Sequence, residues 1–327
     1  MSEKYYNYAI VTPCKNEEWN LRNLINSVMA QTIKPLLWVI VDDGSTDKSG
    51  EILAQLKTKY TWVKTIHLEE SKEYLGSHIA RVYNKGFEFV KDYSNKCSIK
   101  LEYIAILDAD TIPEPEYFEK LIQKLEGNSK LGLASGSTCE YTENISHILE
   151  DVNSKFDLTD PEFWVTYPFS LNKEEIRTDL PMGSARIWKM ECFDETGGRF
   201  DNINMPDAIS TVKAKIKGWE TACFKEIKLI ERSGLSAQGR WYGYKDRGRA
   251  NYVVNLPLYI ILLKSLKYSL KQPYYVGIAY LWGYFESLIS RKEQVKDEEV
   301  IKFYRQVHLK ETKKRQVKRI KEKYSRK

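Results

Sequence analysis

Residues that commonly bind zinc are scarce in this sequence and stand apart from one another. Its four histidines form no cluster of ligands: they are His67, His78, His147 and His308. Its five cysteines are scattered singly: they are Cys14, Cys97, Cys139, Cys192 and Cys223. This pattern argues against a zinc site and indicates reduced thiols, so we expect a cytoplasmic protein.

Apolar runs long enough to cross a membrane are also lacking. The N-terminal stretch MSEKYYNYAIVTP has no apolar core of the length that a signal peptide needs. Segments 253–263 and 272–285 are apolar but have only eleven and fourteen residues, whereas a membrane span needs roughly 20. Such lengths are typical of core helices or of segments at a membrane interface.

Low-complexity sequence is absent apart from a basic end. Residues 310–327 contain ten Lys or Arg and two Glu, a local charge of +8, which leaves −2 for the rest because the whole chain carries +6. Such tails bind anionic lipid or nucleic acid, or are simply solvated. We expect no nucleic acid partner, because the remainder has no basic stripe interleaved with aromatic residues.

The composition is that of a globular protein, with 42% hydrophobic and 29% charged residues among 327. Between residues 8 and 126, four short apolar runs alternate with four stretches of helical period. The apolar runs are 8–13, 36–41, 62–68 and 101–107, and the helical stretches are 17–31, 49–60, 77–93 and 115–126. This alternation predicts a doubly wound α/β sheet.

The stretches 131–141 and 184–190 are left as unpaired pieces, and further strands are expected around 218–231, which would make the sheet mixed. From residue 243 onward the sequence becomes helical in character and rich in Tyr, Leu and Lys. We therefore predict an α/β domain over 1–242 and a helical extension over 243–327.

The extension contains a basic amphipathic pattern. Lysines recur at three- and four-residue spacing beside leucines: Lys264, Lys267 and Lys271 beside Leu262, Leu263, Leu266 and Leu270. Such a helix is typical of contact with a membrane surface, here through 253–327. The alternative is a helix that packs its apolar face on the α/β domain, and the residues leave both interpretations open.

Polar groups follow three of the four predicted parallel strands. They are Thr12 to Glu17 after the first strand, Asp42 and Asp43 after the second, and Asp108 and Asp110 after the fourth. Ligands of open α/β sheets bind beyond these carboxyl ends. Carboxylates gathered there repel one another unless a cation or hydrogen-bond donors lie among them.

The spacing of Asp108 and Asp110 points to a bound cation. Residues i and i+2 of an extended chain point to the same side, so both carboxylates can face one ion. Mg²⁺ and Mn²⁺ favour one or two carboxylates together with phosphate oxygens and water. The alternative is that the pair caps the helix that starts near Pro115.

Five motifs in one order resemble the family 2 glycosyltransferases, whose fold is called GT-A. They are VTPCKNEE (11–18), VIVDDGSTDKS (39–49), LGSHIARVYNKGFEF (75–89), LDAD (107–110) and the acceptor-side segment 183–221. The resemblance covers residues 7–232. It implies a GT-A doubly wound mixed sheet and a membrane-associated enzyme of polysaccharide or glycolipid synthesis.

The resemblance also implies a donor site for a UDP- or GDP-sugar. Its residues are Thr12, Pro13, Glu17, Asp42, Asp43, Arg81, Asp108 and Gly183. Glu17 and Asp43 would contact the nucleoside beside Pro13, and Gly183 would let the backbone approach the sugar. Arg81 would reach the diphosphate or support Asp108, unless it forms a structural salt bridge. Asp110 would hold the metal, Mn²⁺ or Mg²⁺, and Asp108 would contact the ribose or the metal.

Asp207 is the predicted general base, again through the resemblance. An alcohol is a poor nucleophile until a nearby carboxylate removes its proton. The metal would act as a Lewis acid on the departing nucleoside diphosphate. One displacement with one base inverts the anomeric centre, and the acceptor would be a glycan or a lipid-linked sugar. The alternative role for Asp207 is a helix cap after Pro206.

The sequence departs from the family pattern at three places. Pro206 replaces an acid before the base, and Glu231 or Arg232 stands where relatives often have a histidine. QGRW (238–241) is one residue shorter than the Q-x-x-R-W of processive synthases, so we infer no processivity.

Two other functions are open on the residues alone. LDADT matches the DxDxT string of haloacid dehalogenase-type phosphatases, although that motif normally lies on the first strand and here follows the fourth. A non-enzymatic membrane- or RNA-binding protein with a basic tail is the other alternative.

Overall fold

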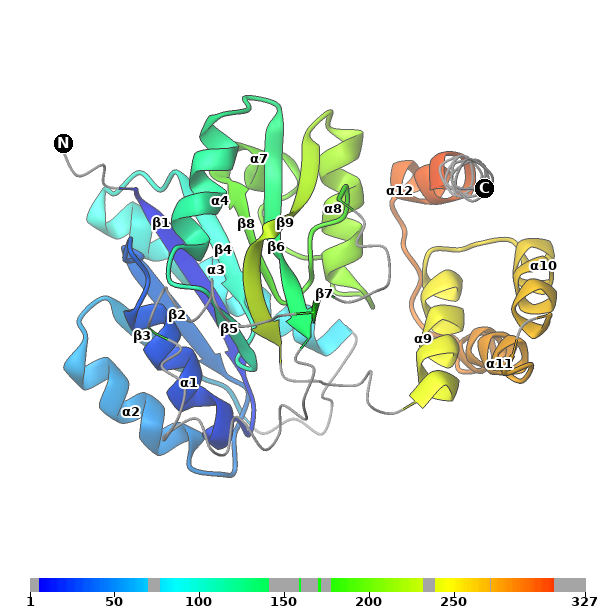
Figure 1. Ribbon diagram of the computed structural model, residues 1–327, viewed down its shortest axis with the longest axis horizontal. Coiled ribbons are helices and arrows are strands. Elements are labelled where there is room, and N and C mark those ends of the chain that lie inside the picture. Colours follow the sequence, from blue (N-terminus) through cyan, green and yellow to red (C-terminus); the bar gives the residue numbers. More distant parts are fainter. Residues whose placement is uncertain are drawn as a thin grey trace. The chain divides into compact units, whose positions relative to one another are not determined.

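The fold is that of a computed structural model, and the residues it describes are 6–69, 77–140, 159, 170–171, 178–231, 239–270 and 272–308. The chain divides into two compact units (Figure 1). The sheet unit comprises Met1–Asn202 and Pro206–Arg232, and the helical unit comprises Ile203–Met205 and Ser233–Lys327.

Four parallel strands form one side of the sheet. They are β1 (Tyr8–Cys14), β2 (Leu37–Asp42), β3 (Val63–His67) and β4 (Tyr103–Leu107), in the spatial order β3-β2-β1-β4. Every residue of β1, β2 and β4 is buried, as expected for parallel strands covered on both faces. The four strands predicted from the apolar runs are confirmed.

The other side of the sheet is mixed, as predicted. It contains β5 (Thr111–Pro113), β6 (Leu131–Glu140), β7 (Ser170–Leu171), β8 (Ala185–Lys189) and β9 (Glu220–Glu231). β8 runs antiparallel to both β4 and β6, β9 is parallel to β6, and β5 is antiparallel to β9. The described residues thus form one nine-stranded sheet, which ends at β5.

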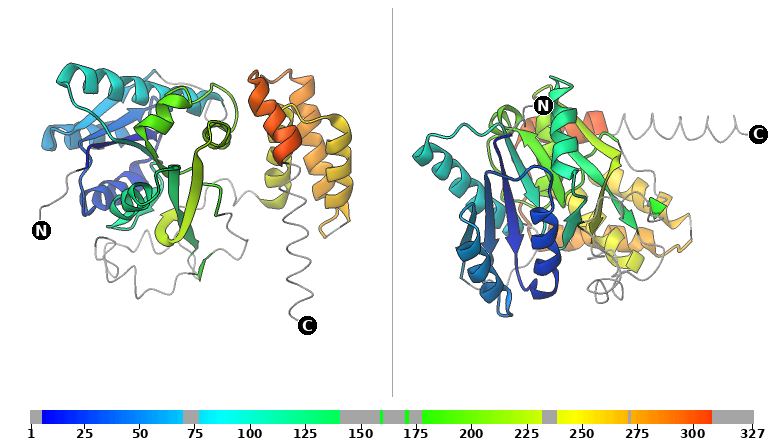
Figure 2. Two further views of the ribbon diagram at one scale, coloured as in Figure 1. Left: turned by 90° about the horizontal axis from the view of Figure 1, so that it is seen from above. Right: turned by 60° about the vertical axis from the view of Figure 1, so that its left-hand side comes forward.

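Helices cover both faces of the sheet (Figure 2). They are α1 (Glu18–Met29), α2 (Ser49–Lys59), α3 (Ser77–Cys97), α4 (Tyr117–Glu126), α7 (Met190–Glu195) and α8 (Pro206–Ile216). Alternate residues of β1 face opposite layers. Tyr8 and Ile10 pack in a core with α1, α2 and α4, whereas Ala9 and Val11 pack in a second core with α3, α7 and α8.

The helical unit contains α9 (Gly239–Val253), α10 (Leu258–Ser269), α11 (Val276–Ile289), α12 (Glu298–Lys302) and a π-helical turn, η2 (Phe303–His308). The predicted boundary between 242 and 243 falls within α9. Helices α9 and α11 cross closely, because a Cβ on Gly248 would lie 1.9 Å from the carbonyl oxygen of Tyr280 and one on Gly283 1.9 Å from that of Lys245. No helix in the described ranges combines the length and apolarity that crossing a membrane would require.

Cysteine pairing is absent where the structure describes the thiols. Cys14, Cys97, Cys192 and Cys223 are all free, and of these only Cys97 is exposed. The cytoplasmic location expected from such thiols stays a prediction.

Candidate active site

The carboxyl ends of β1, β2 and β4 meet at one edge of the sheet because the three strands are parallel neighbours. This edge presents the acidic residues that the sequence singled out. They fall into two groups with different partners, one around Asp43 and one around Asp108.

Asp42 ends β2 and Asp43 follows it, and the two make different contacts. Asp42 accepts a hydrogen bond from the Ser45 amide at 3.0 Å, and its Oδ2 lies 2.9 Å from Nδ1 of His67. Asp43 lies 3.2 Å from Nζ of Lys15 and 2.7 Å from Nε2 of His78. Asp42 therefore closes the turn after β2, while Asp43 is held between two groups that can carry positive charge.

Glu17, Pro13 and Thr12 lie on or just after β1. The Glu17 amide donates to Oγ of Ser49 at 2.9 Å, which fixes the loop against the start of α2. Pro13 is buried and lies level with Val41 of β2. Thr12 is fully buried, and its hydroxyl accepts a hydrogen bond from Nε1 of Trp38 at 2.9 Å. The structure thus gives the Thr12 hydroxyl a packing role in the sheet, while the predicted contact of Thr12 with the donor stays a prediction.

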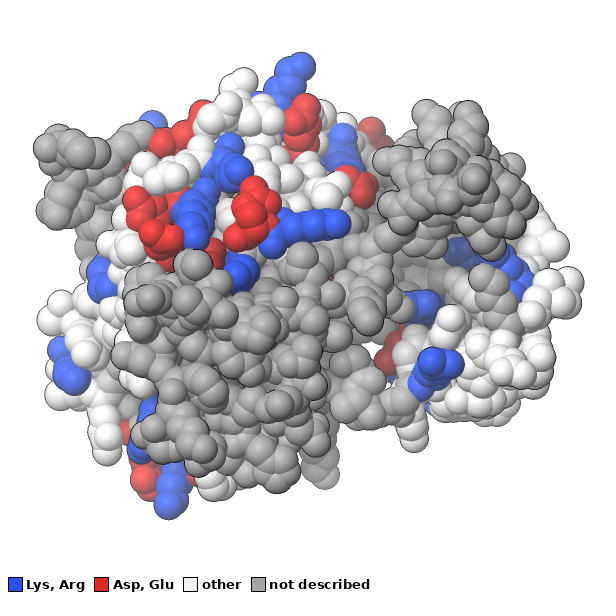
Figure 3. Space-filling view, viewed as in Figure 1, with Lys and Arg blue, Asp and Glu red and all other residues white. Residues whose placement is uncertain are grey.

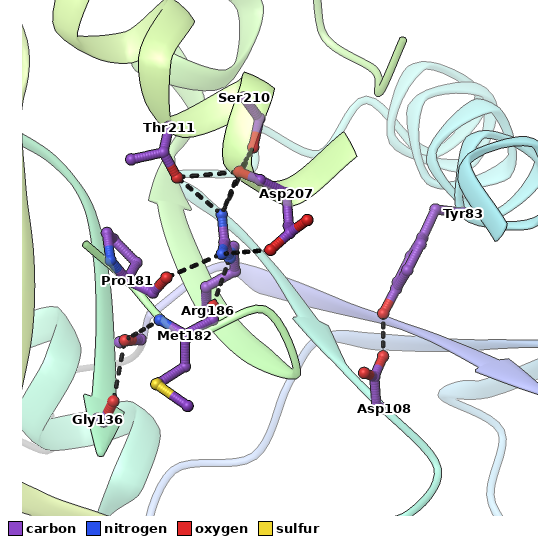
Figure 4. Close-up of polar contacts among 10 residues, drawn as sticks. Tyr83, Asp108, Gly136, Pro181, Met182, Arg186, Asp207, Ser210 and Thr211 are labelled. Carbon is purple, nitrogen blue, oxygen red and sulfur yellow. Dashed lines mark hydrogen bonds and ion pairs between the residues drawn. The ribbon is translucent and has the colours of Figure 1, made fainter. Parts of the chain in front are cut away.

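Asp108 lies where α3 approaches the end of β4. The hydroxyl of Tyr83 donates a hydrogen bond to its Oδ1 (Figure 4). Burial raises the pKa of the Asp108 carboxyl well above its usual range, and the charges of Asp110, Glu231 and Asp207 raise it further, against the lowering effect of Tyr83. Asp108 therefore lies within electrostatic reach of three other carboxylates.

Glu231 joins the predicted pair through strand pairing. The β5–β9 register sets Thr111 opposite Glu231, so Glu231 lies beside Asp110. Burial raises the pKa of Glu231, and the charge of Asp110 adds to this effect. The hydroxyl of Thr138 lies 3.4 Å from Glu231. Such crowding of carboxylates favours a bound cation, which would offset their mutual repulsion.

Asp207 stands in the first turn of α8, with its side chain 41% exposed. Beneath it lies Arg186 of β8, which is only 1% exposed (Figure 4). Arg186 donates from Nη1 to the Asp207 carbonyl at 2.9 Å and to Thr211 at 3.1 Å, and from Nε to the Met182 carbonyl at 2.6 Å. Its Nη2 donates to the Pro181 carbonyl at 3.0 Å. One buried guanidinium thus ties α8 to the loop before β8.

Gly183 belongs to that same loop and lies against Asp207. A Cβ at this position would stand 3.0 Å from Oδ2 of Asp207. The absence of a side chain therefore gives the carboxylate room beside the loop. Arg81 is exposed on α3, two residues before Tyr83, and its predicted role toward a diphosphate stays a prediction.

Sequence reasoning missed several residues of this site. Tyr83 lies in the motif of α3 that we assigned to the family, but only the fold brings its hydroxyl to Asp108. Arg186 was visible in the sequence only as a charged residue within the otherwise apolar start of β8. His78 and Lys15 stood beside predicted site residues, and their pairing with Asp43 depends on tertiary structure.

The fold is of the GT-A type, with acidic residues at the carboxyl ends of its parallel strands. The chain belongs to glycosyl transferase family 2, because the sequence model of that family matches residues 9–211. This membership favours a glycosyltransferase over the phosphatase and the non-enzymatic alternatives.

Curated relatives include probable glucomannan 4-beta-mannosyltransferases of Oryza sativa subsp. japonica. Number 3 is 26% identical over 241 residues, which cover 71% of this chain and 41% of the relative. Number 4 is 27% identical over 223 residues, which cover 66% and 38%. The chain thus spans about two-fifths of the length of these relatives.

Two solved structures resemble the fold at low sequence identity. The mannosyltransferase PcManGT from Pyrobaculum calidifontis, in complex with GDP-Man and Mn²⁺, has a TM-score of 0.51 at 14% identity, covering 88% of this chain and 74% of that one. S. aureus TarS 1-349, in complex with UDP-GlcNAc, has a TM-score of 0.51 at 14% identity, covering 89% and 93%. At this identity the likeness supports the shared fold alone.

Proposed function

We propose that this glycosyltransferase moves a sugar from a UDP- or GDP-sugar to a glycan or lipid-linked acceptor, with inversion and with the help of a divalent cation. The observation that supports it is the cluster formed by the carboxylates of Asp108, Asp110 and Glu231, with Asp207 within electrostatic reach of Asp108. The carboxylate cluster suits a cation bound to the donor diphosphate, and Asp207 suits the hydroxyl of the acceptor.

The nucleoside would bind at the end of β2. Asp43 is 5% exposed and is held by Lys15 and His78, which fixes the direction of its carboxylate. Uracil and guanine each carry a ring N–H that can donate a hydrogen bond to such a carboxylate. Glu17 is anchored by its own amide and adds a second carboxylate to the nucleoside end. PcManGT and TarS were solved with different nucleotides, so either base remains within the proposal.

The residues at the end of β4 fit a hard divalent cation. Their donors are all carboxylate oxygens, which Mg²⁺ and Mn²⁺ prefer. In the part of the chain that the structure describes, no three His, Cys, Asp or Glu form a ready-made cage. A cation that also takes phosphate oxygens and water needs no such cage.

Asp110 and Asp108 would hold the cation, and Glu231 is the adjoining carboxylate in place of the family's histidine. When bound, the ion supplies Lewis-acid stabilisation of the leaving diphosphate. Tyr83 keeps the Asp108 carboxylate oriented toward this edge.

Asp207 would take the proton of the acceptor hydroxyl. Its carboxylate is partly exposed and so accessible to an acceptor, while its backbone is fixed from below by Arg186. A rigid backbone with a partly exposed carboxylate suits general base catalysis, because proton transfer depends on hydrogen-bond reach. One displacement by the activated hydroxyl would invert the anomeric centre.

The decisive experiment compares Asp110→Ala and Asp207→Asn. Nucleotide sugars are first screened by thermal stabilisation with and without Mn²⁺, because a ligand of the folded state raises its stability. Asp110→Ala should lose the Mn²⁺-dependent part of donor binding. Asp207→Asn should bind donor normally and lose about 10²-fold or more in transfer.

Glu231 has its own test, in which Mn²⁺ binding is followed by calorimetry in the presence of the nucleoside diphosphate. Glu231→Gln should weaken Mn²⁺ binding, and Glu220→Gln, at the other end of β9, should leave it unchanged. Normal transfer by Asp207→Asn would remove the base assignment. Retention of the substrate anomer in the product, measured by NMR, would contradict the inverting mechanism.

A further inference from the structure

The outward sides of α10 and α11 are apolar and exposed. On α10, Leu262, Leu263 and Leu266 are 48%, 64% and 62% exposed. On α11, Ile278, Trp282 and Ile289 are 62%, 56% and 79% exposed. We call these six residues the outer apolar face. Spacings of three and four on α10, where Leu262 and Leu263 are adjacent, and of four and seven on α11 place each set on one side of its helix.

The residues of this face on α11 take no part in the packing of α11 on α9 and α10. The buried side of α11 already packs on its neighbours: a Cβ on Gly277 would lie 2.3 Å from the Ser265 carbonyl of α10, and Gly283 meets α9 equally closely. The opposite side is just as apolar, because residues 272–285 contain no charge. A helix that is apolar all round is normally covered on every side. Large exposed apolar patches mark interaction sites.

The polar groups around the face have one sign. From residue 258 to residue 285 the chain contains three lysines and no Asp or Glu. Lys267 is exposed beside the leucines, and Lys264 extends toward Asn251 at 3.4 Å. The next acid, Glu286, is held by Lys245 and Arg249 at 2.9 Å and 2.7 Å. Long lysine side chains at the edge of an apolar face suit a surface of negative charge.

Exposed tyrosines border the same face. Tyr259 lies in the first turn of α10, and Tyr274 and Tyr275 lie in the connection between the two helices. Their side chains are 65%, 59% and 44% exposed. The ring of Tyr275 packs 6.1 Å from that of Trp241 on α9. Tyr and Trp combine an apolar body with a polar tip, which suits the boundary between lipid and water. In Figure 3 the described part of the helical unit is largely white, the colour of residues other than Lys, Arg, Asp and Glu.

We propose that the outer apolar face binds to the surface of an anionic lipid bilayer, with α10 and α11 lying in the plane of the interface. A second copy of the chain fits less well, because a symmetric contact would bring the lysines of the two copies together. Anionic headgroups complement the same lysines. The helices lie on the bilayer and do not cross it, since neither reaches roughly 20 residues.

The test is co-sedimentation of the full chain with phosphatidylcholine vesicles that contain 30% phosphatidylserine. The double variant Ile278→Gln/Trp282→Gln should lower the partition coefficient by at least about tenfold, because it removes two apolar side chains that the bilayer would bury. Trp19→Gln is the matched control, since Trp19 of α1 is an exposed aromatic residue (75%) of the sheet unit. It should partition like the unaltered chain. Circular dichroism checks that the double variant keeps its helices.

A truncated chain that ends at residue 308 distinguishes the contribution of the outer apolar face to vesicle binding from that of the basic tail. This truncated chain should still bind vesicles, and the double variant in the same background should not. The proposal is overturned if the unaltered chain fails to sediment with vesicles, or if removal of the tail alone abolishes binding. It is equally overturned if light scattering shows a dimer that the double variant dissociates.

Discussion

The Nη2 atom of Arg186 lies 3.7 Å from Oδ2 of Asp207, and its Nη1 atom donates to the carbonyl oxygen of the same residue at 2.9 Å. A buried cation on a central strand thus holds the first turn of the helix that bears the proposed base. Burial lowers the pKa of Arg186, and the charge of Asp207 acts in the opposite direction. The pair links the stability of the sheet unit to the position of its proposed base.

Arg186→Gln should therefore lower both turnover and stability. We expect kcat to fall about tenfold or more while the Kd for donor changes little, because Asp207 loses its support and the nucleoside end is untouched. The carbonyl groups left without a donor should cost about 1–3 kcal/mol of unfolding free energy, measured in urea. Lys213→Gln is the control, since Lys213 pairs with Asp201 at 2.8 Å on another side of α8. An equal loss in donor affinity would contradict a positioning role.

Gly183→Ala should impair transfer without unfolding the protein. The new Cβ would stand 3.0 Å from Oδ2 of Asp207, which is closer than ordinary van der Waals contact. Because the Asp207 side chain is partly exposed, we expect it to rotate away and to lose its alignment with the acceptor. The measurement is kcat with soluble acceptor, which should fall about tenfold while Tm stays within a few degrees.

The control for Gly183→Ala is Gly243→Ala in α9. A Cβ there meets nothing within 4 Å, so this variant should keep full activity. Unchanged turnover in Gly183→Ala would show that Asp207 does not depend on this close approach.

Thr12→Val distinguishes a packing role from a donor contact. The substitution leaves Nε1–H of Trp38 without its acceptor inside the core, which should cost about 1–3 kcal/mol of stability. Donor affinity, measured by calorimetry, should stay unchanged because the hydroxyl is fully buried. Thr12→Ser keeps the acceptor and should retain most of the stability. Weakened donor binding at full stability would place Thr12 in the donor site, as the sequence suggested.

Glu286 should make the helical unit sensitive to acid. Burial acts to raise its pKa, but the hydrogen bonds from Lys245 and Arg249 outweigh this effect and hold the pKa of Glu286 below its usual range. A carboxyl whose folded pKa is depressed adds stability above its unfolded pKa of about 4.3, and that stability is lost as pH falls through the folded pKa.

Glu286→Gln should therefore destabilise α9 and α11 at pH 7, and the difference from the unaltered chain should shrink toward pH 3. Amide hydrogen exchange of the two helices at both pH values measures it. Glu293→Gln, which removes an exposed pair with Lys296, should have little effect at either pH. A difference that is equal at pH 7 and pH 3 would exclude the ion pairs as its cause.

Much of the sheet unit was predictable because its signals are local. Apolar runs of strand length and stretches of helical period identified β1 to β4 and α1 to α4, within a few residues of their observed ends. The same local order, compared with a family pattern, named Asp43, Asp108, Asp110 and Asp207 as site residues. Their proposed roles rest on that resemblance and await the experiments above.

The partners of those residues were not predictable, because they come from segments far apart in the chain. Periodicity reports which side of a strand is buried, but not which strand lies next to it. The placing of β8 between β4 and β6, and of β5 against β9, brings Glu231 beside Asp110 and Arg186 beneath Asp207. Likewise, the spacing of lysines and leucines in α10 predicted an amphipathic helix. Only the tertiary structure shows that the leucines stay exposed, because α11 packs on α10 at Ser265 and Ser269 instead.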